Sequence, residues 1–375
     1  MARRVLVTGG AGFIGSHVTD LLLERGDQVR VLDTLDPQVH GPEVRDAGRP
    51  RHLSPDAELI VGDVRDAEIV SKLLADTDVV IHLAAAVGVG QSMYEIVSYT
   101  DTNDRGTAVL MEELLRRPVE RLVVASSMSV YGEGLARRPD GALVEPADRS
   151  VEQLRRGRWE PEDHDGTALE AVPTPETKHP ALNSIYALNK YVQERMALIT
   201  GRAYGIPTVA LRFFNVFGPH QALSNPYTGV LAIFAARLLN RRPPLVFEDG
   251  AQRRDFVHVR DVARACLLAL TTETGIGEVF NVGSGHSRTI TSVAHDLAAV
   301  MSASDLAPHI TGKFRTGDIR HCFADLSKSR DRLGYAPQVD FQAGLTELAE
   351  WLATEIAVDQ VEHATAELER RGLVA

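Results

Sequence analysis

Tyr186 and Lys190 are the pair of side chains in this sequence best suited to chemistry. They lie four positions apart within 184–201, a segment with the apolar periodicity of a helix, so we expect both side chains on one helix face. A phenol, whose ordinary pKa is about 10, becomes a usable base when positive charges stabilise its phenolate. A lysine ammonium would supply one such charge and an oxidised nicotinamide a second. The spacing therefore indicates that Tyr186 takes a carbinol proton while hydride leaves the same carbon.

A serine-rich segment precedes this pair in the sequence. Residues 126–132 read Ser-Ser-Met-Ser-Val-Tyr-Gly and directly follow a β-branched run. They should therefore lie at the carboxyl end of a parallel strand, which is the crevice side of an open sheet. We expect Ser127 to share the proton with Tyr186, and we expect Ser126 and Ser129 mainly to tie the strand end to its neighbours.

A glycine-rich segment near the N-terminus fits a dinucleotide. Residues 7–15 read Val-Thr-Gly-Gly-Ala-Gly-Phe-Ile-Gly, which satisfies GxGxxG from position 10 and GxxGxxG from position 9. The segment lies between a predicted strand and a predicted helix, where backbone amides and the helix N-terminus can bind a pyrophosphate. For the glycine pattern alone, a turn that merely packs the helix on the strand is an even alternative.

Carboxylates and small residues at further strand ends support this interpretation. Asp33 ends the second predicted strand, where it can accept both ribose hydroxyls, and no Arg or Lys directly follows it, which favours NAD over NADP. Asp63 ends the third strand and can meet an adenine amino group, although a helix cap is an equal alternative. Residues 82–86, His-Leu-Ala-Ala-Ala, end the fourth strand with the small side chains that a closely passing cofactor requires.

The elements that must position these groups alternate along the chain. This alternation predicts an α/β fold, a Rossmann doubly wound parallel sheet with a smaller C-terminal α/β substrate domain. The chain has 375 residues, too many for one hydrophobic core. We expect an NAD-binding Rossmann domain over 1–205 and a mainly substrate-binding domain over 206–358, some of whose segments return to the first. The irregular insertion at 133–182 is expected to be a lid over the substrate crevice. Residues 359–375 are expected to be a solvated, charged tail that forms a helix. The predicted strands of the first domain are 4–8, 28–33, 58–63, 79–84 and 121–126.

Charge and cysteine content exclude several classes of protein. Lys and Arg number 40 against 51 Asp and Glu, a net charge of −11, whereas nucleic-acid and membrane-surface binding need the opposite sign. Cys266 and Cys322 form no CxxC pair, and the acidic and histidine residues at 163–165 and 179 lack the spacing of a metal cage, so no metal is expected. Without an apolar run of membrane-spanning length or a leader, the sequence favours the cytoplasm.

Together these residues resemble the extended short-chain dehydrogenase/reductase family, and within it the NAD-dependent nucleotide-sugar epimerases and dehydratases. The resemblance is carried by the positions named above, by Asn103 and by the Arg-Phe-Phe-Asn-Val-Phe-Gly-Pro run at 212–219, and it extends to about residue 351. It implies a homodimer formed through helices near 99–116 and 184–201. The cofactor-binding residues it implies are Gly9, Gly12, Phe13, Ile14, Gly15, Asp33, Asp63, Val64, Leu83, Ala84, Ala85, Asn103, Tyr186 and Lys190. The residues it implies for a dTDP- or UDP-linked sugar are Ser127, Ser129, Asn215, Arg254, Arg315 and Asp318.

The residues after Ser127 discriminate between reactions of this family. Its 4,6-dehydratases carry Asp-Glu there and its decarboxylases a Glu, whereas this chain has Met128 and Ser129, which cannot act as acid or base. Epimerisation remains: oxidation at C4, rotation of the keto sugar and return of hydride. Residues 86–94, the insertion and 317–322 are most similar to sequences assigned as dTDP-L-rhamnose 4-epimerases. The alternatives are a UDP-glucose or UDP-glucuronate 4-epimerase, a net NAD(P)-dependent 4-ketoreductase or dehydrogenase of nucleotide sugars, and a non-catalytic nucleotide-binding protein.

Overall fold

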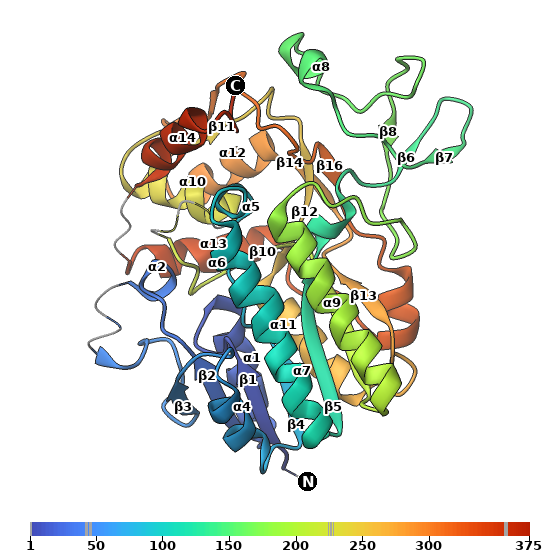
Figure 1. The fold of residues 1–375 in the computed structure, drawn as a ribbon. Coiled ribbons are helices and arrows are strands. Elements are labelled where there is room, and N and C mark those ends of the chain that lie inside the picture. The colour runs from blue at the N-terminus through green and yellow to red at the C-terminus, as the bar shows by residue number, and fades with distance from the viewer. Residues whose placement is uncertain are drawn as a thin grey trace.

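The computed structural model describes residues 2–41, 44, 47–223, 225, 227, 229–355 and 359–375. Its central sheet has seven strands: β1 (Arg4–Thr8), β2 (Gln28–Asp33), β3 (Glu58–Val61), β4 (Val79–His82), β5 (Arg121–Ser127), β9 (Thr208–Phe213) and β13 (Val279–Val282). They lie in the order β13-β9-β5-β4-β1-β2-β3, and every neighbouring pair is parallel (Figure 1). This is a Rossmann sheet, so the predicted fold class is confirmed.

Helices cover both faces of this sheet. They are α1 (Phe13–Glu24), α4 (Ala67–Leu74), α7 (Gly106–Arg116), α9 (Ile185–Tyr204) and α11 (Val259–Thr271). In β1, Val5 and Val7 belong to a core shared with α1 and α11, whereas Leu6 belongs to a second core shared with α4, α7 and α9. Because side chains alternate along a strand and both faces are buried, the strands are continuous apolar runs in the sequence.

A third core lies outside this sheet, between α10 (Val230–Leu239), α12 (Ile290–Val300) and α13 (Phe341–Leu352). Six short strands accompany these helices: β10 (Asn215–Phe217), β11 (Leu245–Val246), β12 (Arg253–His258), β14 (Ser287–Thr289), β15 (His309–Ile310) and β16 (His321–Cys322). From the same part of the sequence, β9, α11 and β13 belong to the Rossmann sheet and its cover. The chain therefore passes between the two regions more than once, and the division at residue 205 stays a prediction.

Short helices connect the larger elements at the strand ends. They are α2 (Pro37–His40), α5 (Val89–Ser92), α6 (Ile96–Thr100), the π-helical turn η1 (Asp101–Arg105), the 3-10 turn η2 (Met128–Tyr131) and the π-helical turn η3 (Ser329–Leu333). Helix α6, η1 and α7 follow one another without a break and run beside α9 on the side of the molecule shown in Figure 1.

The insertion projects from the rest of the molecule (Figure 1). It contains the helix α8 (Val151–Arg155) and a small antiparallel sheet of β6 (Ala136–Arg137), β7 (Leu143–Val144) and β8 (Glu170–Ala171). Both of its ends are fixed near β16: Gly134 N donates to His321 O over 2.7 Å, and Thr174 N donates to Phe323 O over 2.8 Å. The insertion is thus anchored at two points to one short segment.

The C-terminal segment is helical, as the charge pattern led us to expect, but one face of the helix is buried and not solvated. It forms α14 (Val361–Arg370), in which Val361, Ala364 and Leu368 are buried. Their spacing places them on one face, an apolar stripe that the many charged residues obscure in the sequence. Beyond the helix, Phe314 and Ala375 exchange two backbone hydrogen bonds of 2.9 and 3.0 Å. No helix in the described part of the chain is long and apolar enough to cross a membrane.

Candidate active site

Helix α9 carries the predicted catalytic pair. Ser184 caps it by accepting a hydrogen bond from Ala187 N over 3.1 Å, and Tyr186 N donates to Ser92 Oγ over 3.0 Å. These contacts fix the first turn of α9 against α5. Lys190 lies one helical turn further along and is buried, with 3% of its surface exposed.

Burial controls the protonation of both groups. It raises the pKa of Tyr186 to about 12, against a hydrogen bond with Ser127 that lowers it. Burial also lowers the pKa of Lys190 to about 7, while the carboxylates of Glu194 and Asp104 favour the ammonium. The sequence led us to expect a lowered phenol pKa, but in the protein by itself the effect of burial is larger. Within the chain, the group that lowers the pKa of the Tyr186 phenol is the Ser127 hydroxyl.

The serine-rich segment lies where β5 ends and η2 begins. Ser127 Oγ accepts hydrogen bonds from Ser129 N over 3.2 Å and from Ser129 Oγ over 2.9 Å. Ser129 therefore connects the end of β5 to the turn η2 and also orients the Ser127 hydroxyl. Ser126 contacts the catalytic helix instead, because its Oγ donates to Glu194 Oε2 over 2.7 Å.

Two residues that the sequence analysis did not single out support this helix from within. Glu194 accepts hydrogen bonds from Arg212 Nε over 2.8 Å and Nη2 over 2.7 Å, and both side chains are buried. Gln193 is also buried, and its Oε1 accepts from Lys190 Nζ over 2.8 Å. They follow Lys190 by three and four positions, and this spacing of neighbours on one helix face was the available signal.

The glycine-rich loop contains two kinds of glycine. Gly9 has a left-handed φ of +69°, and a Cβ added there would lie 2.8 Å from Ala84 N. A Cβ added at Gly15 would lie 2.2 Å from Gly9 O. At both positions the packing of the protein itself requires glycine. At Gly12 an added Cβ would meet no described atom closer than 3.4 Å, so the absent side chain there leaves open space and is not demanded by the fold.

This open space lies at the N-terminus of α1. No side chain of the described residues caps the helix, so the amides of Phe13 and Ile14 begin its first turn without a side-chain acceptor. Such amides, together with the positive end of the helix dipole, bind phosphate groups. The loop therefore fits the pyrophosphate of a dinucleotide, and all the glycine-motif residues predicted to bind it lie at this turn.

Asp33 ends β2 at the edge of the same loop. Its Oδ2 accepts a hydrogen bond from Ala11 N over 3.1 Å, and its Oδ1 accepts one from Leu35 N over 3.0 Å. The imidazole of His40 lies 3.5 Å from Oδ1. A carboxylate has about four acceptor positions, so the Asp33 carboxylate is held in place and can still accept ribose hydroxyls.

Asp63 and Val64 follow β3 and differ in their surroundings. Asp63 Oδ1 accepts from both N and Nε of Arg65 over 2.9 Å, and this pairing lowers the pKa of Asp63. The cap of α4 is supplied by Asp66, so the capping alternative for Asp63 is wrong. Val64 is buried, and a Cβ added at Gly106 would lie 2.7 Å from its Cγ1.

The end of β4 meets the glycine loop. Ala84 N donates to Thr8 Oγ1 over 3.3 Å, which places the small residues 83–85 beside that loop. Asn103 Oδ1 accepts from Ala86 N over 2.7 Å, and Asn103 Nδ2 donates to Ala86 O over 3.1 Å. The side chain of Asn103 thus holds the backbone that follows β4, next to the surface where the cofactor is expected.

The residues expected to bind the substrate lie at two places. Asn215 begins β10, and its buried Oδ1 has no hydrogen-bond partner among the described residues. Arg254 and Asp318 lie together, with Nη2 and Oδ1 separated by 3.7 Å. Arg254 also donates to the carbonyls of Ile319 and Arg320, the latter over 2.8 Å, so much of its guanidinium already holds the backbone.

Arg315 has more donors available than Arg254. Its guanidinium stacks over the ring of Phe247, 4.6 Å from the ring centre. Its buried Nε has no hydrogen-bond partner in the part of the chain that the structure describes. Of the two arginines expected to neutralise a diphosphate, Arg315 is therefore the better placed to bind one directly.

The histidine and acidic residues of the insertion pair locally. His164 Nδ1 lies 2.8 Å from Asp163 Oδ1, and His179 Nδ1 lies 2.9 Å from Glu145 Oε1. Within the described ranges, no three His, Cys, Asp or Glu side chains converge as metal ligands would.

Comparisons with known proteins find NAD-dependent epimerases of nucleotide sugars. The chain matches the NAD dependent epimerase/dehydratase family over residues 5–151 and 164–283. It is 37% identical to a dTDP-L-rhamnose 4-epimerase of Burkholderia thailandensis, with 94% of this chain and 96% of the relative covered. It is 32% identical to a putative UDP-glucose 4-epimerase of Methanocaldococcus jannaschii, covering 93% and 98%. Among solved structures, a Thermus thermophilus UDP-glucose 4-epimerase in complex with NAD matches with a TM-score of 0.73 and 30% identity, covering 94% of this chain and 100% of that one.

Proposed function

Because the chain belongs to the NAD dependent epimerase/dehydratase family, we propose that it is a nucleotide-sugar 4-epimerase and that its substrate is dTDP-L-rhamnose. The observation that carries this proposal is the arrangement of Tyr186 and Lys190 on α9 at the carboxyl edge of the sheet, with Ser127 at the end of β5 acting to lower the pKa of the phenol. Met128 and Ser129 follow Ser127, so this turn lacks the acid and base that elimination of water would need.

The residues of the chain divide the work of the reaction. Tyr186 takes the proton of the C4 hydroxyl and later returns it, while Ser127 holds the phenolic oxygen through a hydrogen bond. Lys190 places a positive charge one helical turn from the phenol and is positioned to hold the nicotinamide ribose. NAD, when bound, supplies reversible acceptance of the C4 hydrogen as hydride.

Inversion at C4 sets a requirement on substrate binding. The keto sugar must present its opposite face before the hydrogen returns, so tight contacts to the sugar ring would slow the reaction. The anchoring contacts therefore belong on the diphosphate, which does not turn. Arg315, with its free Nε donor, suits this anchoring role. Asn215 could join it only through the amide Nδ2, because its free Oδ1 is an acceptor like the phosphate oxygens.

The choice of substrate rests on similarity. The identity of 37% to a dTDP-L-rhamnose 4-epimerase over 94% of this chain favours a 6-deoxyhexose linked to dTDP. A UDP-glucose 4-epimerase is the second candidate, because the archaeal relative and the NAD-bound solved structure carry that description. These substrates differ in the base and in the C5 and C6 groups, which a few contacts can discriminate.

We also propose a homodimer formed through α6, α7 and α9. Val97 on α6 is 82% exposed and Ile199 on α9 is 59% exposed, and Leu188 on α9 is exposed as well. The helices lie side by side (Figure 1). Burial of such apolar side chains against a second copy would stabilise the pair by the hydrophobic effect. Light scattering of the wild-type protein and of Val97→Glu tests this: a wild-type monomer contradicts the dimer.

The function is tested by NMR of the sugar product, with no cofactor added. The purified protein is incubated separately with dTDP-L-rhamnose, UDP-glucose and UDP-glucuronate. We expect conversion of dTDP-L-rhamnose to its C4 epimer, the 6-deoxy-L-talose nucleotide, and a rate at least about a hundredfold lower with Tyr186→Phe. Conversion of UDP-glucose alone would support the second candidate. A 4-keto-6-deoxy sugar as the final product would contradict an epimerase. So would a separate incubation with NADH in which turnover consumes the NADH.

A further inference from the structure

We propose that Arg149 of the insertion is a positioning residue that holds the substrate loop, defined here as residues 314–318, so that Arg315 faces the diphosphate. This inference rests on the proposed function, in which Arg315 binds a nucleotide sugar. It gives the insertion the role of a fixed clamp, in place of the lid that the sequence led us to expect.

The insertion contacts both ends of the substrate loop. At one end the ring of Trp159 packs against the ring of Phe314, with 6.3 Å between ring centres. At the other end Arg149 Nη2 donates to the carbonyl of Asp318 over 2.9 Å. Arg315 lies between these two contacts, next to Phe314. A loop held at both ends by one neighbouring segment loses conformational freedom, so Arg315 is pre-organised for binding.

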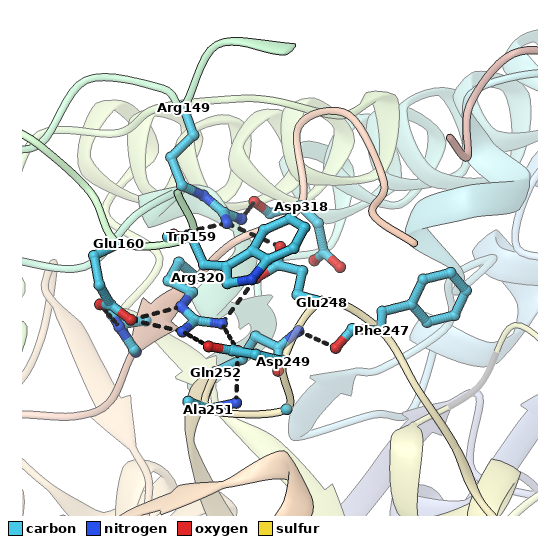
Figure 2. Close-up of polar contacts among 12 residues, drawn as sticks. Arg149, Trp159, Glu160, Phe247, Glu248, Asp249, Ala251, Gln252, Asp318 and Arg320 are labelled. Atoms are coloured by element: carbon cyan, nitrogen blue, oxygen red, sulfur yellow. Dashed lines mark hydrogen bonds and ion pairs between the residues drawn. The ribbon is translucent and has the colours of Figure 1, made fainter. Parts of the chain in front are cut away.

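Arg149 makes these contacts from a buried position. Its side chain is 2% exposed and lies 3.3 Å from Glu133 Oε1. Nη1 donates to Trp159 O over 3.0 Å and to Glu248 Oε1 over 2.9 Å. Figure 2 shows the guanidinium directed at Trp159, Glu248 and Asp318 together. The planar fork of arginine carries its donors on separate nitrogens and so reaches these three acceptors, whereas the three donors of a lysine ammonium lie on a single nitrogen. Lysine is therefore not an equivalent residue here.

Glu248 is the partner that connects Arg149 to the start of the substrate loop. Its amide donates to Lys313 O over 2.7 Å, and its carbonyl accepts from Gly312 N over 3.2 Å. Glu248 has a φ of +54°, a left-handed conformation that costs a non-glycine residue energy. The contacts of the side chain offset this energy: in addition to the bond from Arg149 to Oε1, the Glu248 Oε2 accepts a hydrogen bond from the fully buried Arg320 over 2.9 Å.

Arg320 completes the clamp behind the loop. Its guanidinium donates to Asp249 Oδ1 over 2.6 Å and to Glu160 Oε1 over 2.6 Å (Figure 2). Glu160 belongs to the insertion, whereas Asp249 and Glu248 follow β11. The ion pairs thus join the insertion to the substrate-binding region at several points, in addition to the two anchored ends near β16. Swinging the insertion away as a lid would break the fully buried pair of Arg149 with Glu248, which is costly, and the partly exposed pair of Glu160 with Arg320.

The residue before Arg149 links the clamp to the catalytic helix. Asp148 Oδ1 accepts from Asn183 Nδ2 over 2.7 Å, and Asn183 directly precedes the cap of α9. A Cβ added at Gly317 of the substrate loop would lie 3.3 Å from Asn183 O. Insertion, substrate loop and catalytic helix therefore meet at adjacent residues, and displacement of the insertion would move the substrate relative to Tyr186.

Arg149→Lys and Arg149→Met test the proposal in the NAD-loaded enzyme. We expect both to raise KM for the nucleotide sugar and Kd for dTDP about tenfold, the loss of a charge-assisted hydrogen bond, while kcat changes less than twofold and bound NAD is unchanged. Arg149→Met leaves Glu248 short of a partner and can impair folding. The double variant Arg149→Met with Glu248→Gln removes both charges of that pair, and it must show the same rise in KM.

Arg156→Met is the matched control, because Arg156 belongs to the same insertion but is exposed and pairs with Glu152 one helical turn away. It should leave every parameter unchanged. Unaltered KM and dTDP affinity in folded Arg149 variants would overturn the clamp, as would equal losses in Arg156→Met. A wild-type protein that binds neither dTDP nor UDP would instead overturn the proposed function, so the two failures are distinguishable.

Discussion

Lys190 Nζ donates a hydrogen bond to Gln193 Oε1 over 2.8 Å, and the chain of contacts continues away from the site. Gln193 Nε2 donates to Thr107 Oγ1 over 2.8 Å, and that hydroxyl lies 3.0 Å from His82 Nε2. His82 Nδ1 in turn lies 2.7 Å from Thr8 Oγ1, at the start of the glycine loop. Every member is buried. Burial and Lys190 lower the pKa of His82 to about 3, so it is a neutral link.

Substitution of Gln193 should shift the pH dependence of turnover. The Gln193 oxygen favours the ammonium form of Lys190, whose pKa is about 7. Gln193→Leu removes that acceptor and should lower the Lys190 pKa, so the alkaline limb of the kcat profile moves to lower pH by about one unit. Gln193→Glu adds a negative charge and should move the limb to higher pH. Shifts in the same direction, or none, would contradict a role of Gln193 in setting the charge of Lys190.

Removal of the phenolic hydroxyl should separate chemistry from binding. Tyr186→Phe keeps the ring and its packing but has no proton acceptor, so kcat should fall by about 10²- to 10⁴-fold. The variant should purify with as much NAD as the wild-type protein, measured by absorbance after denaturation. Ser127→Ala, which keeps the phenol, should lose less activity. Normal turnover by Tyr186→Phe would remove the basis of the proposed mechanism.

The glycine loop offers a test that separates ligand binding from packing. Gly12→Ala adds a Cβ whose nearest neighbour, Gly9 O, is 3.4 Å away, an ordinary van der Waals contact. The fold should therefore be kept, while the methyl group reduces NAD binding. Gly15→Ala places a Cβ 2.2 Å from Gly9 O and should lower stability by about 1–3 kcal/mol. Thermal melting and bound-NAD content of both variants give the answer. A melting temperature lowered equally in both would mean that Gly12 is also a packing glycine.

The elements that the sequence predicted well are those set by local pattern. The parallel strands are continuous apolar runs because both faces of the sheet are buried. In β1, for example, Val5 and Val7 pack into the core on one face and Leu6 packs into the core on the other. The helix at Tyr186 has a serine cap, so its start and the shared face of Tyr186 and Lys190 follow from spacing. Spacing alone does not reveal that the buried face of this helix is largely polar between residues 189 and 194. Their chemical roles, like those of the other site residues, stay predictions.

The features that the sequence did not predict depend on distant partners. Arg149 meets Glu248 and Asp318 at separations of 99 and 169 residues, and its own surroundings in the sequence are those of a charged surface loop. The position of the last residues likewise depends on a distant partner, because Ala375 hydrogen-bonds with Phe314. Secondary-structure propensity and hydrophobic periodicity depend on nearby residues and do not report contacts between distant ones. A segment whose charged residues form buried ion pairs therefore has the same sequence pattern as an exposed charged loop.

The C-terminal residues should affect substrate binding through the substrate loop. Phe314 pairs with Ala375, and Arg315 forms an antiparallel bridge with Val374. Deletion of residues 371–375 removes these hydrogen bonds, so KM for the nucleotide sugar should rise several-fold with bound NAD unchanged. Substitution of the exposed Glu355 by Gln leaves the loop untouched and serves as the control. A normal KM in the truncated protein would show that the pairing has no role in binding.

A column of imidazoles beside the glycine loop should make the protein less stable in mild acid. His17 and His220 stack with ring centres 4.6 Å apart, His52 stacks on His220 at 4.8 Å, and His52 Nε2 lies 2.9 Å from Ala11 O. Burial is the main cause that lowers the pKa of all three. Burial together with repulsion from His17 and His52 lowers the pKa of His220 to about 3, while His52 also lowers the pKa of His17 and His40 lowers that of His52. The folded protein therefore keeps them neutral at a pH where unfolded histidine, with a pKa of about 6.5, binds a proton.

The sign of the effect follows from this difference. Above about pH 6.5 both states are neutral and the histidines contribute no pH dependence, whereas below it the unfolded state binds more protons and gains stability. The urea midpoint should fall between pH 7 and pH 5, with each buried histidine contributing up to about 1 kcal/mol per pH unit. His220→Phe keeps a ring in the stack without the titratable nitrogen and should flatten this dependence. His179→Gln, at a position with an 86% exposed side chain, should not. Parallel loss of stability in wild type and His220→Phe would assign the acid sensitivity to other groups.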